Sequence, residues 1–148
     1  MNYRSHLIGG AVVYTILLYL LNLFNVTLTL EQKCIALIIC LFGALFPDFD
    51  TKSKIQIWLY RVAFISLLIL AILFPYNPYI WVGALILLTP LIVNHRGIFH
   101  NIWFLTLLPI GVALVLSNFY PQNQLFFFIM TSFFIGGTLS HLILDRWK

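Results

Sequence analysis

Charged residues are scarce in this chain of 148 residues. Eight are Lys or Arg and four are Asp or Glu, which is 8% of the sequence, whereas hydrophobic residues make up 62%. A soluble domain carries about 25% charged residues, because its exterior faces water. The shortage of charge therefore excludes a soluble globular protein and predicts that lipid surrounds most of the molecule.

Cysteine is also rare. Cys34 and Cys40 lie in one apolar run, about 9 Å apart along a helix axis, which is too far for a disulfide bond. They also lack the Cys-x-x-Cys spacing of a metal or redox site. We expect both side chains to be small, buried and apolar in character.

A stripe of basic residues is missing too. Proteins that bind nucleic acid gather Lys and Arg on one face, and here the net charge of +4 is spread between apolar runs. We therefore expect no nucleic-acid partner.

Long apolar runs occupy most of the chain, separated by five polar breaks, of which the first holds Asn25 and Thr27 and the other four contain Pro or Gly. Crossing the hydrocarbon layer takes about 20 apolar residues as a helix, and a helix satisfies its own backbone polar groups. The pattern predicts an all-α, polytopic transmembrane helix bundle that forms a single integral-membrane domain over residues 1–148. About six spans are expected, or four if two of the shorter runs do not cross. The runs are 7–24, 28–46, 55–74, 79–93, 98–116 and 125–144.

The basic residues predict the orientation of these spans. An even number of spans places both termini on one side of the membrane, together with the connections 47–54 and 94–97. That side holds Arg4, Lys52, Lys54, Arg96, Arg146 and Lys148, whereas the opposite side holds only Lys33. Because cytoplasmic loops carry an excess of Lys and Arg, we expect both termini to be cytoplasmic in a multi-pass protein of the cytoplasmic (inner) membrane.

Ionisable residues gather at the predicted cytoplasmic ends of the spans. All four His and three of the four acidic residues fall there, and only Glu31 lies opposite. Ionisable groups at a membrane are costly and point to a functional site. Imidazole and carboxylate ligands without thiolate suit one or two divalent metal ions, zinc first, with manganese, iron or magnesium as alternatives. The candidate metal ligands are His6, Asp48, Asp50, His95, His100, His141 and Asp145.

The spacing of these acids and histidines allows a functional and an ordinary interpretation. A helix stacks His141 and Asp145 on one face, where they can bind one metal ion or form a terminal ion pair. Asp48 and Asp50 alternate along a segment that we expect to be extended after Pro47, which aims both at one side. Alternatively, Asp50, Thr51 or Ser53 caps the next helix, which needs only one such residue.

Two further imidazoles flank an arginine. Gly97 allows a turn that brings His95 and His100 together, whereas an unbroken helix would point them apart. Arg96 could hold a phosphate through two parallel hydrogen bonds, or could serve only as a cytoplasmic anchor.

Four short segments resemble a known family. They are the N-terminal stretch ending in His6, Phe-Pro-Asp-Phe-Asp at 46–50, His-Arg-Gly-Ile-Phe-His-Asn at 95–101 and Ser-His-Leu-Ile-Leu-Asp at 140–145. In order and membrane side they resemble the membrane-bound metal-dependent hydrolases of the LexA-regulated, YdjM-like family, over nearly the whole chain. The resemblance implies a prokaryotic cytoplasmic-membrane hydrolase with a poorly defined substrate. This chain has Phe99 and Asn101 where that family commonly has Thr and Ser, which removes hydroxyl contacts to a substrate.

Other intramembrane enzymes match less well. Type-2 phosphatidate phosphatases share a His-x-x-x-Asp ending, but they need an Arg six residues before that His, where this chain has Ile135. Site-2 proteases require His-Glu-x-x-His and prenyl-protein proteases require a pair of Glu. The single Glu of this chain excludes both.

The sequence therefore predicts a metal-dependent hydrolase that acts at the cytoplasmic membrane face. A bound metal ion polarises an ester or phosphoryl oxygen and activates water. We expect Arg96, His141 and Asp145 to be catalytic, membrane lipid to be a partner, and the substrate to be an amphiphile, most simply a lipid phosphate or phosphodiester. The alternatives are a transporter or metal-ion-handling protein and a non-catalytic, metal-stabilised membrane protein. A transport pathway would spread polar groups along the spans, whereas here they gather at one end.

Overall fold

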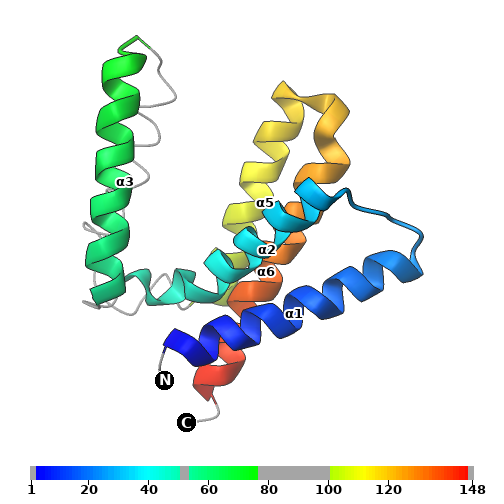
Figure 1. Cartoon of the computed structure of the whole chain (residues 1–148). Coiled ribbons are helices and arrows are strands. Elements are labelled where there is room, and N and C mark those ends of the chain that lie inside the picture. The colour runs from blue at the N-terminus through cyan, green and yellow to red at the C-terminus, as the bar shows by residue number, and fades with distance from the viewer. Residues whose placement is uncertain (1–2, 51–53, 77–100, 147–148) are drawn as a thin grey trace. The chain divides into compact units, whose positions relative to one another are not determined.

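The computed structural model describes the backbone of residues 3–50, 54–76 and 101–146, with the side chains of 3–48, 61–76 and 101–146. Within these ranges all regular structure is helical (Figure 1), as predicted. The elements are α1 (Tyr3–Leu23), α2 (Leu30–Leu45), the 3₁₀-helix η1 (Phe46–Asp50), α3 (Lys54–Leu73), α5 (Ile102–Phe119), the 3₁₀-helix η2 (Pro121–Asn123) and α6 (Gln124–Arg146).

Four helical segments among the described residues are long and apolar enough to cross a membrane. They are Tyr3–Leu23, Leu30–Asp48, Ile102–Phe119 and Pro121–Arg146, and Arg61–Leu73 is a shorter apolar helix. This agrees with the predicted four to six spans. The predicted span 79–93 lies outside the described residues.

The start of α5 is set by a capping residue. The fifth run was predicted from about residue 98, and α5 begins at Ile102, while residues 98–100 lie outside the described residues. The side-chain oxygen of Asn101 accepts a hydrogen bond of 2.9 Å from the backbone N–H of Trp103. Such a cap satisfies a backbone donor that has no partner within the helix and therefore favours a helix start at this position.

The chain divides into two compact units, residues 1–47 with 100–148 and residues 48–99. The first unit contains α1, α2, α5 and α6, and the second contains α3. The single integral-membrane domain over residues 1–148 stays a prediction.

The connection between α1 and α2 is built from local signals. Asn25 adopts a positive φ of 57°, which Asn tolerates better than most residues and which lets the chain turn after α1. Thr29 and Gln32 then form a capping box at the start of α2, with hydrogen bonds of 3.2 Å and 3.0 Å between side chains and backbone N–H groups. The turn at Asn25 reverses the chain, and the capping box then starts α2 next to α1.

The core of the first unit lies where α1, α2 and α6 pack together. Its buried residues are Ala36, Cys40, Ile129, Met130 and Phe133. Elsewhere on these helices large apolar side chains are exposed, among them Ile8, Ile38 and Ile143. Such exposure is unfavourable in water but not in lipid, which supports the predicted membrane surroundings.

The prediction for the cysteines is half confirmed. Cys40 is buried, and its thiol donates a hydrogen bond of 3.3 Å to the carbonyl of Gly10. Cys34, however, is exposed. Six residues turn a helix by about 240°, so the two side chains cannot both lie on the side of α2 that packs into the core.

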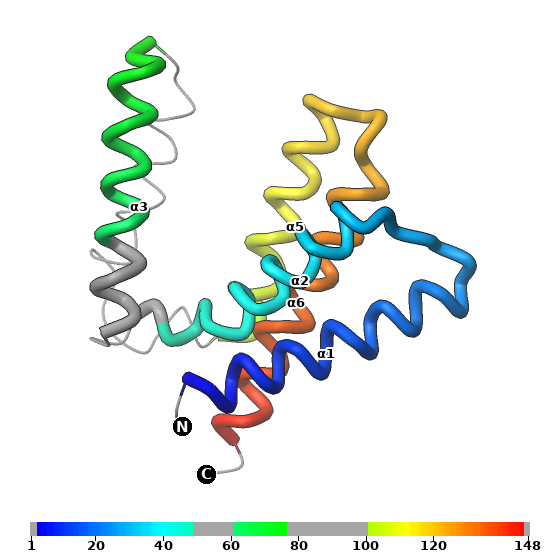
Figure 2. The backbone as a smooth tube through the Cα atoms, in the orientation of Figure 1, coloured from blue at the N-terminus to red at the C-terminus, as the bar shows by residue number. Residues whose placement is uncertain are grey.

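Glycines bring the backbones of α2 and α6 into direct contact. A Cβ atom on Gly43 would overlap the carbonyl oxygen of Phe134. A Cβ atom on Gly137 would overlap the carbonyl oxygen of Cys40 and lie 2.8 Å from the backbone N of Ala44. Figure 2 shows the α2 and α6 tubes meeting near the start of α1. This close approach forms the end of the bundle where the candidate site lies.

Candidate metal-binding site

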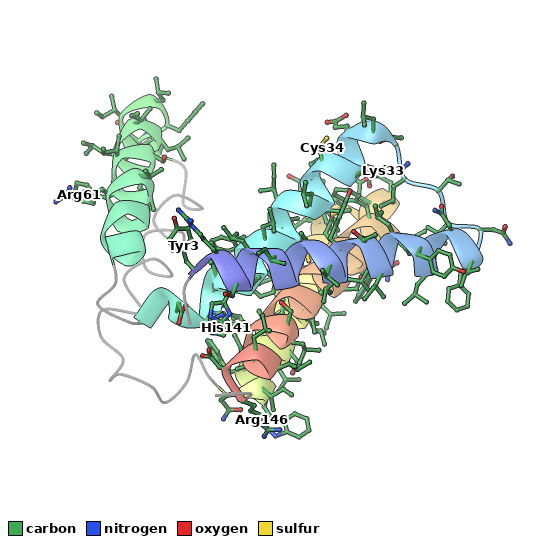
Figure 3. All side chains as sticks on the ribbon, turned by 60° about the horizontal axis from the view of Figure 1, so that its bottom comes forward. Tyr3, Lys33, Cys34, Arg61, His141 and Arg146 are labelled. Carbon is green, nitrogen blue, oxygen red and sulfur yellow. The ribbon has the colours of Figure 1, made fainter. Side chains whose placement is uncertain are left out.

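Three of the predicted ligands meet at one end of the first unit. His6 comes from the start of α1, and His141 and Asp145 come from the last turns of α6. Their potential ligand atoms all lie within 4.8 Å of one another. Figure 3 labels His141 at this end, with Lys33 and Cys34 at the opposite end of α2. The start of α1 and the end of α6 are therefore neighbours, as the even span count predicts.

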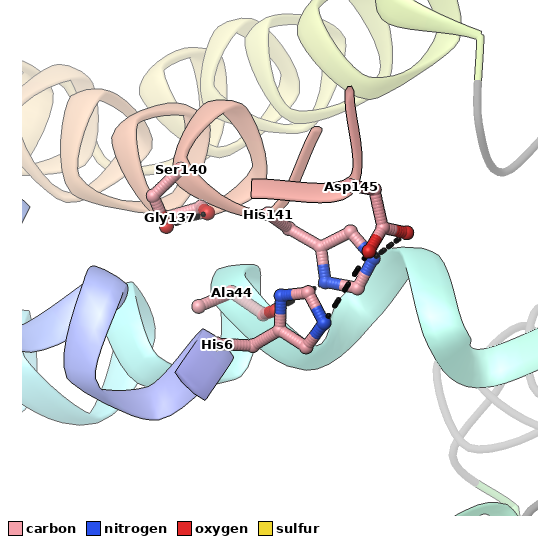
Figure 4. Close-up of polar contacts among 6 residues, drawn as sticks. All are labelled: His6, Ala44, Gly137, Ser140, His141 and Asp145. Carbon is pink, nitrogen blue, oxygen red and sulfur yellow. Dashed lines mark hydrogen bonds and ion pairs between the residues drawn. The ribbon is translucent and has the colours of Figure 1, made fainter. Parts of the chain in front are cut away.

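The Asp145 carboxylate lies beside the two imidazoles and faces one nitrogen of each (Figure 4). One of its oxygens is 3.6 Å from Nε2 of His6, and the other is 3.3 Å from Nε2 of His141. The two rings stack with their centroids 3.9 Å apart and an angle of 18° between their planes. Stacking makes both rings present the same nitrogen, Nε2, to one carboxylate.

The site is buried on the histidine side and open on the carboxylate side. His6 is 1% exposed and His141 is fully buried, whereas the side chain of Asp145 is 31% exposed. Burying imidazole nitrogens is costly unless they bind a partner. Asp145 is therefore the member of the cluster that contacts the surroundings of the protein.

A backbone carbonyl fixes the orientation of His141. Its Nδ1 lies 2.8 Å from the carbonyl oxygen of Ala44 in α2. Because that oxygen can only accept a hydrogen bond, the contact requires hydrogen on Nδ1 of His141. Nε2 is the atom that faces Asp145. A metal-binding histidine is commonly oriented in this way, with the other ring nitrogen donating to a carbonyl or carboxylate.

The donor set fits a divalent cation. Two imidazole nitrogens and a carboxylate, without a thiolate, are ligands for zinc, manganese or iron. Three protein ligands are also the number that catalytic zinc sites use, with a further position for water or substrate. Within the described part of the chain, His6, His141 and Asp145 are the group whose atoms converge in this way.

The remaining predicted site residues have different outcomes. His95, Arg96 and His100 lie outside the described residues, as does the side chain of Asp50. Asp48 is partly buried in η1 and belongs to the second unit of the chain. Their place in the site stays a prediction.

The expectation of an extended segment at Asp48 and Asp50 is wrong. Residues Phe46–Asp50 form a 3₁₀-helix, in which residues two apart point in directions about 120° different. Proline fits this geometry because its ring holds φ near the helical value. Alternation along an extended strand therefore does not apply to these two carboxylates.

Sequence reasoning missed two features of the site, the ring stacking and the Ala44 carbonyl. Stacking depends on the distance between α1 and α6, which spacing along one helix does not reveal. A backbone carbonyl carries no residue-type signal of its own, and the nearest hint was Gly137, four residues before His141, which indicated close helix packing.

No curated protein and no solved structure matches this chain significantly. The sequence model of the YdjM inner membrane protein family matches residues 1–148. This match agrees with the resemblance carried by the His6, 46–50, 95–101 and 140–145 segments and with a location in the inner membrane. Because the match covers the whole chain and the structure contains several helices able to span a bilayer, the chain belongs to the YdjM inner membrane protein family.

Proposed function

We propose that this protein is a metal-dependent hydrolase that acts at the cytoplasmic face of the inner membrane on an amphiphile, a lipid phosphate or phosphodiester. The observation that carries the proposal is the cluster of His6, His141 and Asp145. Two buried imidazoles from opposite ends of the sequence present Nε2 to one partly exposed carboxylate. Structural stability of a membrane helix bundle does not need such an arrangement, because apolar packing and small-residue contacts supply it.

In this proposal His6, His141 and Asp145 hold the cation. A bound divalent cation polarises a phosphoryl or ester oxygen and makes water a stronger nucleophile. The stacked imidazoles close the inner side of the site to water, and the Ala44 carbonyl keeps His141 in the tautomer that binds through Nε2. Asp145, the most exposed of the three, is placed to accept a proton from an attacking water.

Residues beyond the described cluster complete the proposal. Arg96 would bind the phosphate of the substrate, since its guanidinium matches two phosphate oxygens. Asp48, Asp50, His95 and His100 would supply further ligands or a second cation.

The location of the cluster supports an amphiphilic substrate. Gly9 and Gly10 follow His6 on α1, and beyond them exposed apolar residues such as Val12 and Ile16 continue along the helix. A head group can therefore reach the site while its acyl chains stay beside apolar helix surface. A water-soluble substrate would gain nothing from a site at the membrane edge.

The hydroxyl groups of the helices favour this proposal over a transport pathway. Thr15, Thr106, Ser117, Ser132 and Thr138 each donate a hydrogen bond to a carbonyl three or four residues earlier in their own helix. Hydroxyls used in this way satisfy themselves locally and do not line a route for ions. Among the described residues, side-chain bridges between helices at the His6 end include those of His6, Cys40 and His141, and Tyr14 donates a further one to the Lys33 carbonyl toward the other end of α2.

The first test is metal analysis of the detergent-purified protein. We expect bound divalent metal in the wild type and little in His141→Ala, with Glu31→Gln as a control that retains it. A folded, metal-free wild type after growth with added zinc, manganese and iron contradicts the proposal.

The second test is activity. Hydrolysis of a phospholipid panel should be abolished by chelation and restored by a divalent ion, and Arg96→Ala should retain metal but lose most turnover. Absence of activity on the whole panel at every metal tested would favour the metal-handling or structural alternatives.

A further inference from the structure

The Ala44 carbonyl that orients His141 lies in the last turn of α2. A carbonyl inside an α-helix ordinarily accepts a hydrogen bond from the N–H four residues later. Here the carbonyl instead meets Nδ1 of His141 at 2.8 Å, across the contact between α2 and α6. The way in which α2 ends explains how this oxygen can serve a side chain from another helix.

The end of α2 tightens into 3₁₀ geometry. The N–H of Phe46 donates to the carbonyl of Gly43, three residues earlier, and η1 begins at the same residue. In this pattern the donor for the Ala44 carbonyl would be residue 47, which is proline and has no N–H. Proline therefore offers no N–H to the Ala44 carbonyl in this pattern, and that carbonyl meets Nδ1 of His141.

Glycines bring His141 within reach of this carbonyl. Gly137 has the backbone of Cys40 and Ala44 against its Cα, so that α6 touches α2 one turn before His141. Gly10 likewise lets α1 approach α2 closely, since a Cβ atom on Gly10 would lie 2.9 Å from Cβ of Ala44. Phe46 also packs edge-on against Phe134, with ring centroids 5.2 Å apart. Ala44 and Phe46 are thus held against the helix that carries His141, and Pro47, which follows them, is fully buried.

We propose that Pro47 is a positioning residue of the candidate site. By removing the N–H that would compete for the Ala44 carbonyl, Pro47 keeps His141 in the tautomer with hydrogen on Nδ1 and with Nε2 facing Asp145. The effect of Pro47 on metal affinity rests on the proposed function, whereas its effect on the His141 tautomer does not. Pro47 touches neither substrate nor cation in this scheme and acts only through Ala44 and His141.

The test measures the tautomer directly. The full-length protein, labelled with ¹⁵N-histidine and purified in detergent, is examined at pH 8 without metal by long-range ¹H–¹⁵N correlation, with His141→Gln to assign the signals. We expect wild-type His141 to carry its hydrogen on Nδ1. In Pro47→Ala the restored N–H competes for the Ala44 carbonyl, and a substantial fraction of His141 should change to the Nε2–H form. A proline that only stops the helix would lower stability without moving this signal.

Zinc affinity, measured by competition with a chromophoric chelator, provides the second readout. Loss of a partner that orients a ligand typically weakens metal binding about 10-fold or more, and we expect that loss in Pro47→Ala. The matched control is Pro109→Ala, which removes the proline inside α5 and should leave both the tautomer and the affinity unchanged.

The outcomes separate the two proposals. A tautomer shift in Pro47→Ala without zinc binding by any variant supports the role of Pro47 and overturns the proposed function. Zinc binding with an unchanged His141 tautomer in Pro47→Ala overturns the role of Pro47 and leaves the proposed function standing. If Pro47→Ala fails to fold, the wild-type spectrum still decides, because absence of hydrogen from Nδ1 of His141 in the metal-free protein overturns the inference.

Discussion

The contact between α2 and α6 has two halves that are built differently. Toward the start of α2, side chains interdigitate, with Ala36 and Cys40 against Ile129, Met130 and Phe133. Toward its end, glycines remove the side chains and the backbones touch, at Gly43 against Phe134 and at Gly137 against Cys40 and Ala44. Only the second half can bring a backbone carbonyl to an imidazole. The comparison teaches that the first half contributes packing, whereas the second also positions chemical groups.

The first prediction concerns the membrane side of the glycine half, the part of the α2–α6 contact at Gly43 and Gly137. Its outcome is all or none. In a Cys34→Ala background, Arg146→Cys should react with a membrane-impermeant thiol reagent only from the cytoplasmic side, and Asn123→Cys only from the opposite side. The reason is that the two positions lie at opposite ends of α6 and the basic residues favour a cytoplasmic location for its C-terminal end. Labelling of position 123 from the cytoplasm would invert the orientation and remove the cytoplasmic site.

Loss of metal is the largest effect expected within the glycine half. Asp145→Asn and His6→Ala each remove one of the three converging donors, so metal content should fall to near background in elemental analysis. Asp48→Asn and His100→Ala test whether the ligands predicted from sequence also contribute, while Glu31→Gln should retain metal. Normal occupancy in both Asp145→Asn and His6→Ala would show that the cluster is not the metal site.

Gly137→Ala tests the backbone contact itself. The added Cβ would overlap the carbonyl oxygen of Cys40, and relieving that overlap should cost about 3 kcal/mol of stability, less about 1 kcal/mol from better helix propensity. Because Ala44 moves away from His141, metal affinity should fall in parallel.

The control is Gly111→Ala in α5, where a Cβ atom would meet nothing within 4 Å. It should be neutral or stabilising by up to about 1 kcal/mol. Unfolding in mixed detergent, followed by circular dichroism, measures both variants. Equal stability of the two would contradict the glycine contact.

The smallest effect is expected in the side-chain half. Phe133→Leu exchanges one fully buried apolar side chain for another of similar volume, and should cost about 1 kcal/mol of stability. Metal affinity should stay at the wild-type value, since no metal-binding group lies in this half. A loss of affinity as large as that of Gly137→Ala would remove the distinction between the two halves.

Much of the fold, and part of the site, could be predicted from the amino-acid sequence. Scarce charge and long apolar runs required membrane helices, and α1, α2 and α6 lie where the runs predicted them. The placement of His6, His141 and Asp145 at one end followed from the same reasoning, because the length of each span decides at which membrane surface its last polar residue emerges. The cap at Asn101 sets the start of α5 more closely than the apolar pattern could, because a cap depends on one side chain and not on average hydrophobicity.

Distances between helices were decided only by the tertiary structure. The stacking of His6 on His141, the bond from His141 to the Ala44 carbonyl and the exposure of Cys34 all depend on which faces of α1, α2 and α6 meet. In lipid, an apolar face packs against a neighbouring helix or against acyl chains at similar free energy, so hydrophobicity along the sequence does not select the contacting face. The small residues Gly10, Gly43 and Gly137 select it, through backbone contacts that exist only once the helices are assembled.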